Sequence, residues 1–101
     1  MKRLYVLVRK DLHPIYACVQ GGHAVAEFAI NHPGAFKEWM NGYLIYLNGG
    51  AYRSMLGWLD KLTLEYPDLS WSVFKEPDLD GQITAIAVYC DGRIFERVRT
   101  L

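Results

Sequence analysis

The stretch "LYVLV", at residues 4–8, decides the fold class of this 101-residue chain. Five apolar residues that favour β-structure stand in a row without alternation. Such a run predicts a strand buried on both faces, as in sheets covered by helices on either side. Two more runs of this kind follow, "YLIYL" at 43–47 and "ITAIAVY" at 83–89. "SWSVF", at 70–74, alternates polar and apolar residues, which is typical of a half-exposed or edge strand.

Helical patterns separate these strands. Over residues 15–30 a set of apolar residues recurs with a period near 3.6, which predicts a helix: Ile15, Cys18, Val19, Val25, Phe28 and Ala29. "NHPG" at 31–34 ends that helix, because a proline disfavours helical conformation in the residue before it. A short helix is predicted over 35–40 and an amphipathic helix over 51–66. The last segment, 94–101, fits a helix and a strand equally well.

The predicted order is therefore β-α-α-β-α-β-β. Helices between buried strands indicate an α/β fold, a three-layer α/β/α single domain with a mixed sheet of about four strands. The length suits one domain over residues 1–101. The link between the last two strands is too short for a helical crossover. Those strands are therefore either joined by a tight antiparallel connection or placed apart in the sheet.

Composition narrows the class of protein. Lys plus Arg and Asp plus Glu both number 11, so no global basic excess points to nucleic acid. The basic residues do cluster near the chain ends, and they would form a local phosphate-binding patch if those ends meet: Lys2, Arg3, Arg9 and Lys10, then Arg93, Arg97 and Arg99. The five-residue apolar run near the N-terminus is too short for a signal peptide or a membrane span. Cys18 and Cys90 read as reduced, buried thiols, and we expect a soluble, cytoplasmic protein.

The segment "YACVQGGHA", at 16–24, is unusual for a helix. Two adjacent rows follow from helical spacing. One row is polar or amphipathic throughout: Tyr16, Gln20, His23 and Glu27. The other consists mostly of small residues: Ala17, Gly21, Ala24 and Phe28. Gly21 and Gly22 each cost roughly 1 kcal/mol relative to alanine in a helix interior. Either close packing against the sheet or close approach of a ligand would offset that cost.

These residues resemble the opening of the type 2 peptidyl-tRNA hydrolases, the class typical of archaea and eukaryotes. That family has an apolar strand, then R-x-D-L, then Q-x-x-H-A on the first helix. "YVLVRKDL" at 5–12 and "QGGHA" at 20–24 carry both motifs. Further along, "GQITAIAV" at 81–88 resembles the family's G-x-x-T and the strand after it. The resemblance covers most of the chain.

The resemblance implies a single domain, commonly a homodimer, that cleaves the ester between a peptide and tRNA without a metal or organic cofactor. It also implies that Gln20 and His23 lie in or near the reaction site. Two positions depart from the family. Tyr16 stands where the family has a lysine, four residues before the glutamine. The loop "KEPDLDGQ", at 75–82, replaces a segment with a functional aspartate, so that Glu76, Asp78 or Asp80 would have to serve.

Ester hydrolysis needs a positioned water, a proton acceptor and donors for the developing oxyanion. On this reading His23 takes the proton, Gln20 donates to the oxyanion or positions the water, and Glu76 or Asp78 orients the imidazole. Tyr16 supplies a hydrogen bond without the positive charge of lysine. The candidate substrate-binding residues are Arg9, Asp11, Tyr16, Gly81 and Thr84.

Two other functions stay open at this point. One is a catalytically inactive relative that binds a protein or RNA partner. The other is a hydrolase of a small substrate, because the acidic residues of 76–80 would repel an RNA backbone. No P-loop, dinucleotide-binding glycine pattern or zinc-ligand spacing occurs in the chain.

Overall fold

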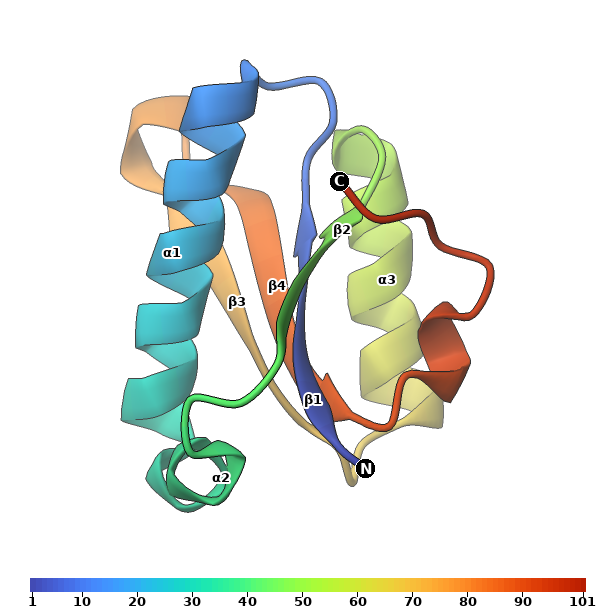
Figure 1. Cartoon of the computed structure of the whole chain (residues 1–101). Helices are drawn as coiled ribbons and strands as arrows, with labels where there is room; N and C mark the ends of the chain where they lie inside the picture. The colour runs from blue at the N-terminus through green and yellow to red at the C-terminus, as the bar shows by residue number, and fades with distance from the viewer.

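The computed structural model describes the whole chain, residues 1–101, as a four-stranded sheet with helices on both faces (Figure 1). The strands are β1 (Arg3–Val8), β2 (Leu44–Asn48), β3 (Ser70–Glu76) and β4 (Gln82–Cys90). The helices are α1 (Pro14–Asn31), α2 (Pro33–Trp39) and α3 (Tyr52–Glu65). Two short 3₁₀ turns, η1 (Pro77–Leu79) and η2 (Arg93–Phe95), complete the elements.

The sheet is mixed, with the strand order β2-β1-β4-β3. β1 and β2 run parallel, whereas β4 is antiparallel to both β1 and β3. The short link between β3 and β4 therefore forms a tight antiparallel connection, one of the two arrangements expected. Helices α1 and α2 lie on one side of the sheet and α3 lies on the other, which confirms the three-layer α/β/α fold (Figure 1).

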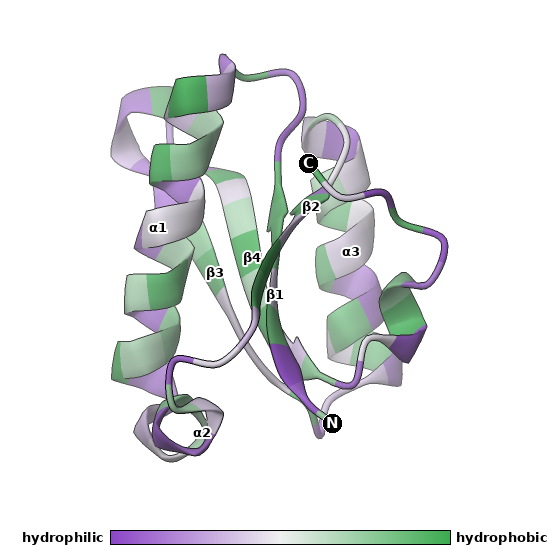
Figure 2. Cartoon of the chain, in the orientation of Figure 1, coloured by the Kyte–Doolittle hydropathy of each residue, from purple (hydrophilic) through white to green (hydrophobic).

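The two central strands explain why their sequences are apolar without alternation. In β1, Leu4, Val6 and Val8 belong to the core under α1, whereas Tyr5 and Leu7 belong to the core under α3. β4 divides its residues between the same two cores. Because both faces of β1 and β4 are covered, every residue along them except the first of each strand, Arg3 and Gln82, is buried. Figure 2 shows hydrophobic colour along most of β4 and along β1 beyond its purple start.

The small-residue row of α1 packs against the sheet. The buried residues are Ala17, Gln20, Gly21, Ala24 and Phe28, whereas Ile15 is 72% exposed and Val19 is 51% exposed. Of the apolar residues with the 3.6-residue period, Phe28 is buried and Val25 packs against the core, while Ile15 and Val19 face outward. Cys18 is exposed as well, so the prediction of two buried thiols is correct for Cys90 only.

Close packing explains one of the two adjacent glycines. A Cβ atom at Gly21 would lie 2.6 Å from the ring of Tyr46 on β2, so a methyl group does not fit there without a shift of that ring. At Gly22 a Cβ atom would meet nothing within 4 Å. The helix therefore lies against β2 at Gly21, and packing gives no reason for Gly22.

The C-terminal segment covers the free edge of β2. Arg99 accepts a backbone hydrogen bond from Asn48 at 2.8 Å, and Leu101 donates one to Tyr46 at 3.0 Å. Thr100 forms an isolated antiparallel bridge with Leu47. The segment that was ambiguous in sequence is thus a 3₁₀ turn followed by a short edge pairing, which protects an otherwise unpaired strand edge. No helix in the structure is both long and apolar enough to cross a membrane.

Candidate functional site

Four polar side chains meet where the first half of α1 packs over the end of the β3–β4 hairpin. Tyr16 and Gln20 come from α1, Glu76 is the last residue of β3, and Thr84 comes from β4. Gln20 and Thr84 are fully buried, and Glu76 is 9% exposed. We call these four residues the polar network.

A β-bulge turns Thr84 toward α1. Phe74 pairs with Ala85 and Lys75 pairs with Ile83, so Thr84 is an extra residue between them. Strict alternation would place Thr84 and Ala85 on opposite faces of the sheet. The bulge lets both face α1, while Ile83 remains in the core under α3. On β3, residues 72, 74 and 76 follow the ordinary alternation, and Glu76 therefore faces the same helix.

The hydrogen bonds of the polar network all lead, from donor to acceptor, toward the carboxylate of Glu76. The Thr84 hydroxyl donates to Gln20 Oε1 at 2.6 Å, and Gln20 Nε2 donates to Glu76 Oε1 at 3.0 Å. The Tyr16 hydroxyl donates to the same carboxylate oxygen at 3.0 Å. An ionised carboxylate only accepts hydrogen bonds, so the amide of Gln20 must turn its nitrogen toward Glu76. Its oxygen then remains for Thr84, and every buried polar atom has a partner.

This arrangement holds a negative charge in place. The hydrogen bond from Gln20 lowers the pKa of Glu76, and the bond from Tyr16, the backbone N–H of Asp78 and the charge of His23 act in the same direction against desolvation. Burial, followed by the bond to Glu76, raises the pKa of Tyr16. The site therefore combines an ionised carboxylate with a neutral phenol.

His23 lies one turn beyond Gln20 and reaches solvent. Its ring stacks on Phe74, with 4.5 Å between ring centroids and 13° between planes. Gln20, by contrast, has no exposed surface, so it cannot contact a substrate directly. Gln20 instead holds Glu76 in place through its hydrogen bond. The groups beside Glu76 that solvent can reach are the imidazole of His23 and the half-buried phenol of Tyr16.

Among the three carboxylates of the loop, Glu76 is the one that faces α1. The side chain of Asp78 is exposed, and only its backbone N–H reaches Glu76, at 3.5 Å from Oε2. Asp80 and Gly81 both adopt left-handed backbone, with φ of 56° and 74°. Gly81 also donates its N–H to the carbonyl of Glu76 at 2.9 Å. These two residues close the hairpin turn, and that closure fixes the position of Glu76.

Arg9 and Asp11 form a separate ion pair. The Arg9 guanidinium binds both carboxylate oxygens of Asp11, at 3.0 and 2.7 Å, and Gln82 Oε1 at 2.9 Å. The hydrogen bond from Arg9 lowers the pKa of Asp11. This pair ties the end of β1 to the start of β4. Its side chains share no hydrogen bond with the side chains of the polar network, although the Arg9 backbone N–H donates to the Thr84 carbonyl at 3.2 Å. Sequence reasoning missed Gln82 and Phe74, the partners of Arg9 and His23, because neither belongs to a recognisable motif.

None of the four surface pockets of the molecule is lined by Tyr16, His23 or Glu76. The polar network opens onto an outer surface rather than into a cavity. Sites for small molecules are usually concave, with volumes of about 300–1,000 Å³. The polar network therefore lies outside any enclosed space of the kind in which small molecules usually bind. The structure contains no group of three or more His, Cys, Asp or Glu residues placed to hold a metal ion.

A comparison of the sequence with protein-family models finds no match, and a comparison with curated proteins finds none either.

Proposed function

We propose that this protein hydrolyses the ester of peptidyl-tRNA or a related acylated RNA, as a divergent type 2 peptidyl-tRNA hydrolase in which tyrosine replaces the family lysine. The observation that carries the proposal is the polar network, which fixes an ionised Glu76 beside an exposed histidine. The motif residues Gln20 and Thr84 supply two of the four members of this network.

In the proposed mechanism His23 accepts the proton of the attacking water. The fixed charge of Glu76 stabilises the imidazolium that forms, because His23 is close enough to Glu76 to affect its pKa. Tyr16 donates to Glu76 from the lysine position but leaves its charge uncancelled. That charge is then available to the imidazolium in the transition state.

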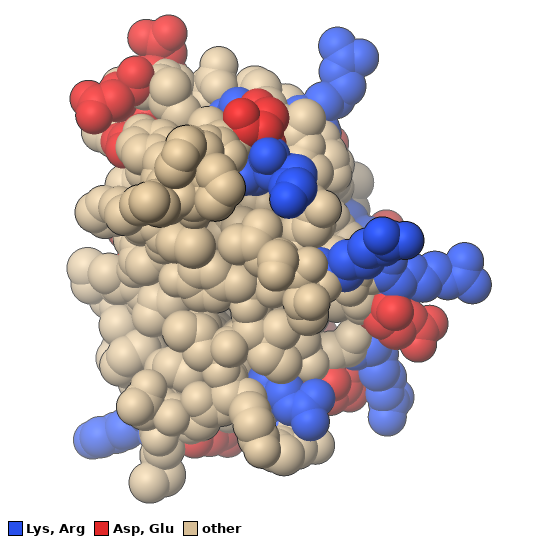
Figure 3. Space-filling view, turned by 45° about the horizontal axis from the view of Figure 1, so that its top comes forward, with Lys and Arg blue, Asp and Glu red and all other residues tan.

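An RNA substrate is supported by the basic residues on the same end of the sheet. Lys10 bonds through its backbone to Gly50, and Arg99 bonds to Asn48, so both lie beside the start of α3 and the exposed Arg53. We call Lys10, Arg53 and Arg99 the basic patch. Figure 3 shows most of the visible Lys and Arg side chains along one side of the molecule, with some acidic side chains among them and a further acidic group at the opposite corner. Lys2, Arg3 and Arg93 lie at the opposite end, so the two terminal clusters meet only in part.

The basic patch predicts a moderate dependence of RNA binding on salt. Three phosphate contacts give a slope of about −2 to −3 in log affinity against log salt, which is a loss of roughly 15- to 65-fold between 50 and 200 mM salt. Lys10→Ala and Arg99→Ala should each reduce the slope by about 1. Lys37→Ala, on α2, serves as the matched control. Since the substrate belongs to translation, we propose a cytoplasmic location.

The activity is tested by the release of an N-acetylated amino acid from blocked aminoacyl-tRNA. Glu76→Gln keeps the shape of the side chain but removes its charge, and we expect its rate to fall by about 10²-fold. Glu65→Gln removes an exposed carboxylate at the end of α3 and should leave the rate unchanged. Equal rates for the two variants would contradict the proposed role of Glu76.

We also propose that the protein forms a homodimer through its uncharged face. This face consists of Ile15, Val19 and Ile30 on α1 with Met40, Tyr43 and Leu44 nearby, residues that are between 45% and 82% exposed. Figure 3 shows a broad area without charged side chains. The six residues expose on the order of 800 Å², about what each partner contributes to a standard interface. Sedimentation should show a dimer that Val19→Arg dissociates, and a wild-type monomer at all concentrations would contradict the proposal.

A further inference from the structure

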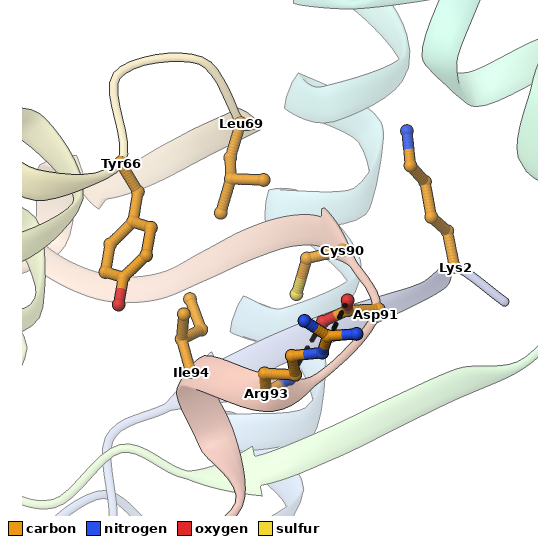
Figure 4. Close-up of a pocket in the computed structure, with 7 residues that line it drawn as sticks. All are labelled: Lys2, Tyr66, Leu69, Cys90, Asp91, Arg93 and Ile94. Carbon is orange, nitrogen blue, oxygen red and sulfur yellow. Dashed lines mark hydrogen bonds and ion pairs between the residues drawn. The ribbon is translucent and has the colours of Figure 1, made fainter.

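A pocket of about 380 Å³ opens at the end of the sheet opposite the polar network (Figure 4). Its seven lining residues are Lys2, Tyr66, Leu69, Cys90, Asp91, Arg93 and Ile94. Cys90 pairs with Arg3 at the start of β1, whereas Ala85 pairs with Val8 at its other end. Thr84 and Cys90 are therefore separated by roughly 20 Å along β4. The pocket has no part in the hydrolysis proposed above.

The walls of this pocket are apolar. Tyr66 follows α3, Leu69 precedes β3 and Ile94 belongs to η2, and all three are only half-buried although they pack against the core under α3. Figure 4 shows the sulfur of Cys90 between them, pointing into the space. Burial raises the pKa of the Cys90 thiol, so the floor is uncharged at neutral pH. The hydrophobic core is thus open to solvent at this point.

The charged groups at the rim of the pocket are Asp91 and Arg93. Asp91 accepts hydrogen bonds from the backbone N–H of Arg93 at 3.0 Å and forms an ion pair with its Nε at 3.2 Å. Both carboxylate oxygens of Asp91 are therefore occupied. The Arg93 side chain is 89% exposed, and its terminal nitrogens remain free for another anion. Lys2 also lines the pocket, but its Nζ points away from Cys90 and lies 5.4 Å from the centroid of the Tyr89 ring, which belongs to the core under α1 (Figure 4).

We propose that this pocket binds a small carboxylate with an apolar body. The apolar body lies between Leu69, Ile94 and Cys90, and the carboxylate binds the terminal nitrogens of Arg93, a geometry in which arginine recognises planar anions well. The volume is at the lower end of the range of about 300–1,000 Å³ for ligand pockets, which suits one aromatic ring or a short acyl chain.

The test is a titration of ¹⁵N-labelled protein with octanoate, with 3-phenylpropionate and with octylamine, followed by amide chemical shifts. Both carboxylates should give saturable shifts for residues 66–69 and 90–94. Tighter binding of octanoate would indicate an acyl ligand, and tighter binding of 3-phenylpropionate an aromatic one. Octylamine has the same apolar length as octanoate but the opposite charge, and it should give no saturable shifts there. Arg93→Ala should weaken carboxylate binding about tenfold.

Two further variants keep the test decisive. Arg97→Ala removes the same charge from the same segment but does not line this pocket, so binding should stay within about twofold of wild type. Leu69→Trp should fill the pocket and abolish the shifts. Because the Arg93 side chain is exposed, Arg93→Ala should not disturb folding, and it tests the site even if Leu69→Trp fails to fold. Absence of saturable shifts, equal binding of octylamine, or equal effects of Arg93→Ala and Arg97→Ala would overturn the proposal.

Discussion

Removing the hydroxyl of Thr84 tests the structural basis of the polar network. Thr84→Val preserves the shape of the side chain but leaves Gln20 Oε1, which is fully buried, without its donor at 2.6 Å. A buried polar group without a partner costs about 1–3 kcal/mol. For a domain of about 100 residues each kcal/mol corresponds to roughly 4–8 °C in melting temperature. We therefore expect Thr84→Val to lower the melting temperature by about 5–20 °C.

A double-mutant cycle makes the prediction sharper. Gln20→Leu alone leaves both the Thr84 hydroxyl and one bond to Glu76 unmade. Once Gln20 is leucine, Thr84→Val removes a hydroxyl that already lacks its partner, so the second change should cost little. The coupling free energy between the two positions should be about 1–2 kcal/mol.

Urea unfolding followed by circular dichroism measures each free energy of unfolding. Thr63→Val is the matched control, because the Thr63 hydroxyl bonds to the Leu59 carbonyl on the exposed side of α3. That variant should change the free energy by no more than about 0.5 kcal/mol. If the losses at Gln20 and Thr84 were additive, or if Thr84→Val cost no more than Thr63→Val, the network would not be the cooperative unit described here.

Three more predictions follow from the same geometry. Gly22→Ala should stabilise the protein by about 0.5–1 kcal/mol. Gly21→Ala should be about 1–3 kcal/mol less stable than Gly22→Ala, because its Cβ would lie 2.6 Å from the Tyr46 ring. Equal melting temperatures for the two variants in thermal unfolding would refute this. Glu76 and Asp11 both have lowered pKa values in the folded state. Their ionised forms therefore stabilise the protein fully above the pKa values of the unfolded chain, about 4, and this stabilisation is lost as the pH falls through the pKa values of the folded state. Glu76→Gln should reduce the loss of stability at acid pH, and an unchanged acid limb of the stability–pH curve would argue against an ionised Glu76. Tyr16→Lys places a cation beside Glu76 and cancels the charge that the proposed mechanism uses to stabilise the imidazolium, so it should lower the rate of hydrolysis about tenfold. An unchanged or higher rate in a folded variant would contradict that role of the Glu76 charge.

The order of elements could be predicted from the sequence because both central strands are covered on both faces. β1 and β4 leave no side chain to water over most of their length, and this produces continuous apolar runs. The observed ends of the helices and strands differ from the predicted ones by at most two residues. The edge pairing of the C-terminal segment could not be predicted, because three residues that pair with β2 carry no pattern of their own.

The packed face of α1 was predictable in part, because the row of small residues indicates close approach to the sheet. Ile15 and Val19 fit a helical period, yet they face outward, because the sheet under α1 admits only small residues at Gly21 and Ala24. The outward apolar residues are the ones to which we assign the dimer contact. Periodicity alone does not say whether an apolar row packs inside the domain or against another molecule.

The polar network was predictable in part. Spacing along the helix placed Tyr16 and Gln20 on one row, and alternation along β3 from Phe74 would have favoured Glu76 over its neighbours. The position of Thr84 was beyond such reasoning, because a bulge reverses the face that alternation assigns to it. The burial of Gln20, which changes its part from a contact with substrate to support of Glu76, also required the three-dimensional structure.

The measurement that tests the account most directly is the single-turnover release of N-acetylated amino acid from blocked aminoacyl-tRNA by wild type and by His23→Ala. His23 is exposed, so the variant should fold normally, and circular dichroism verifies this. The account predicts turnover by wild type and a loss of about 10²-fold or more in the variant. No release by the folded wild-type protein, or equal rates for both proteins, would contradict hydrolysis at this site.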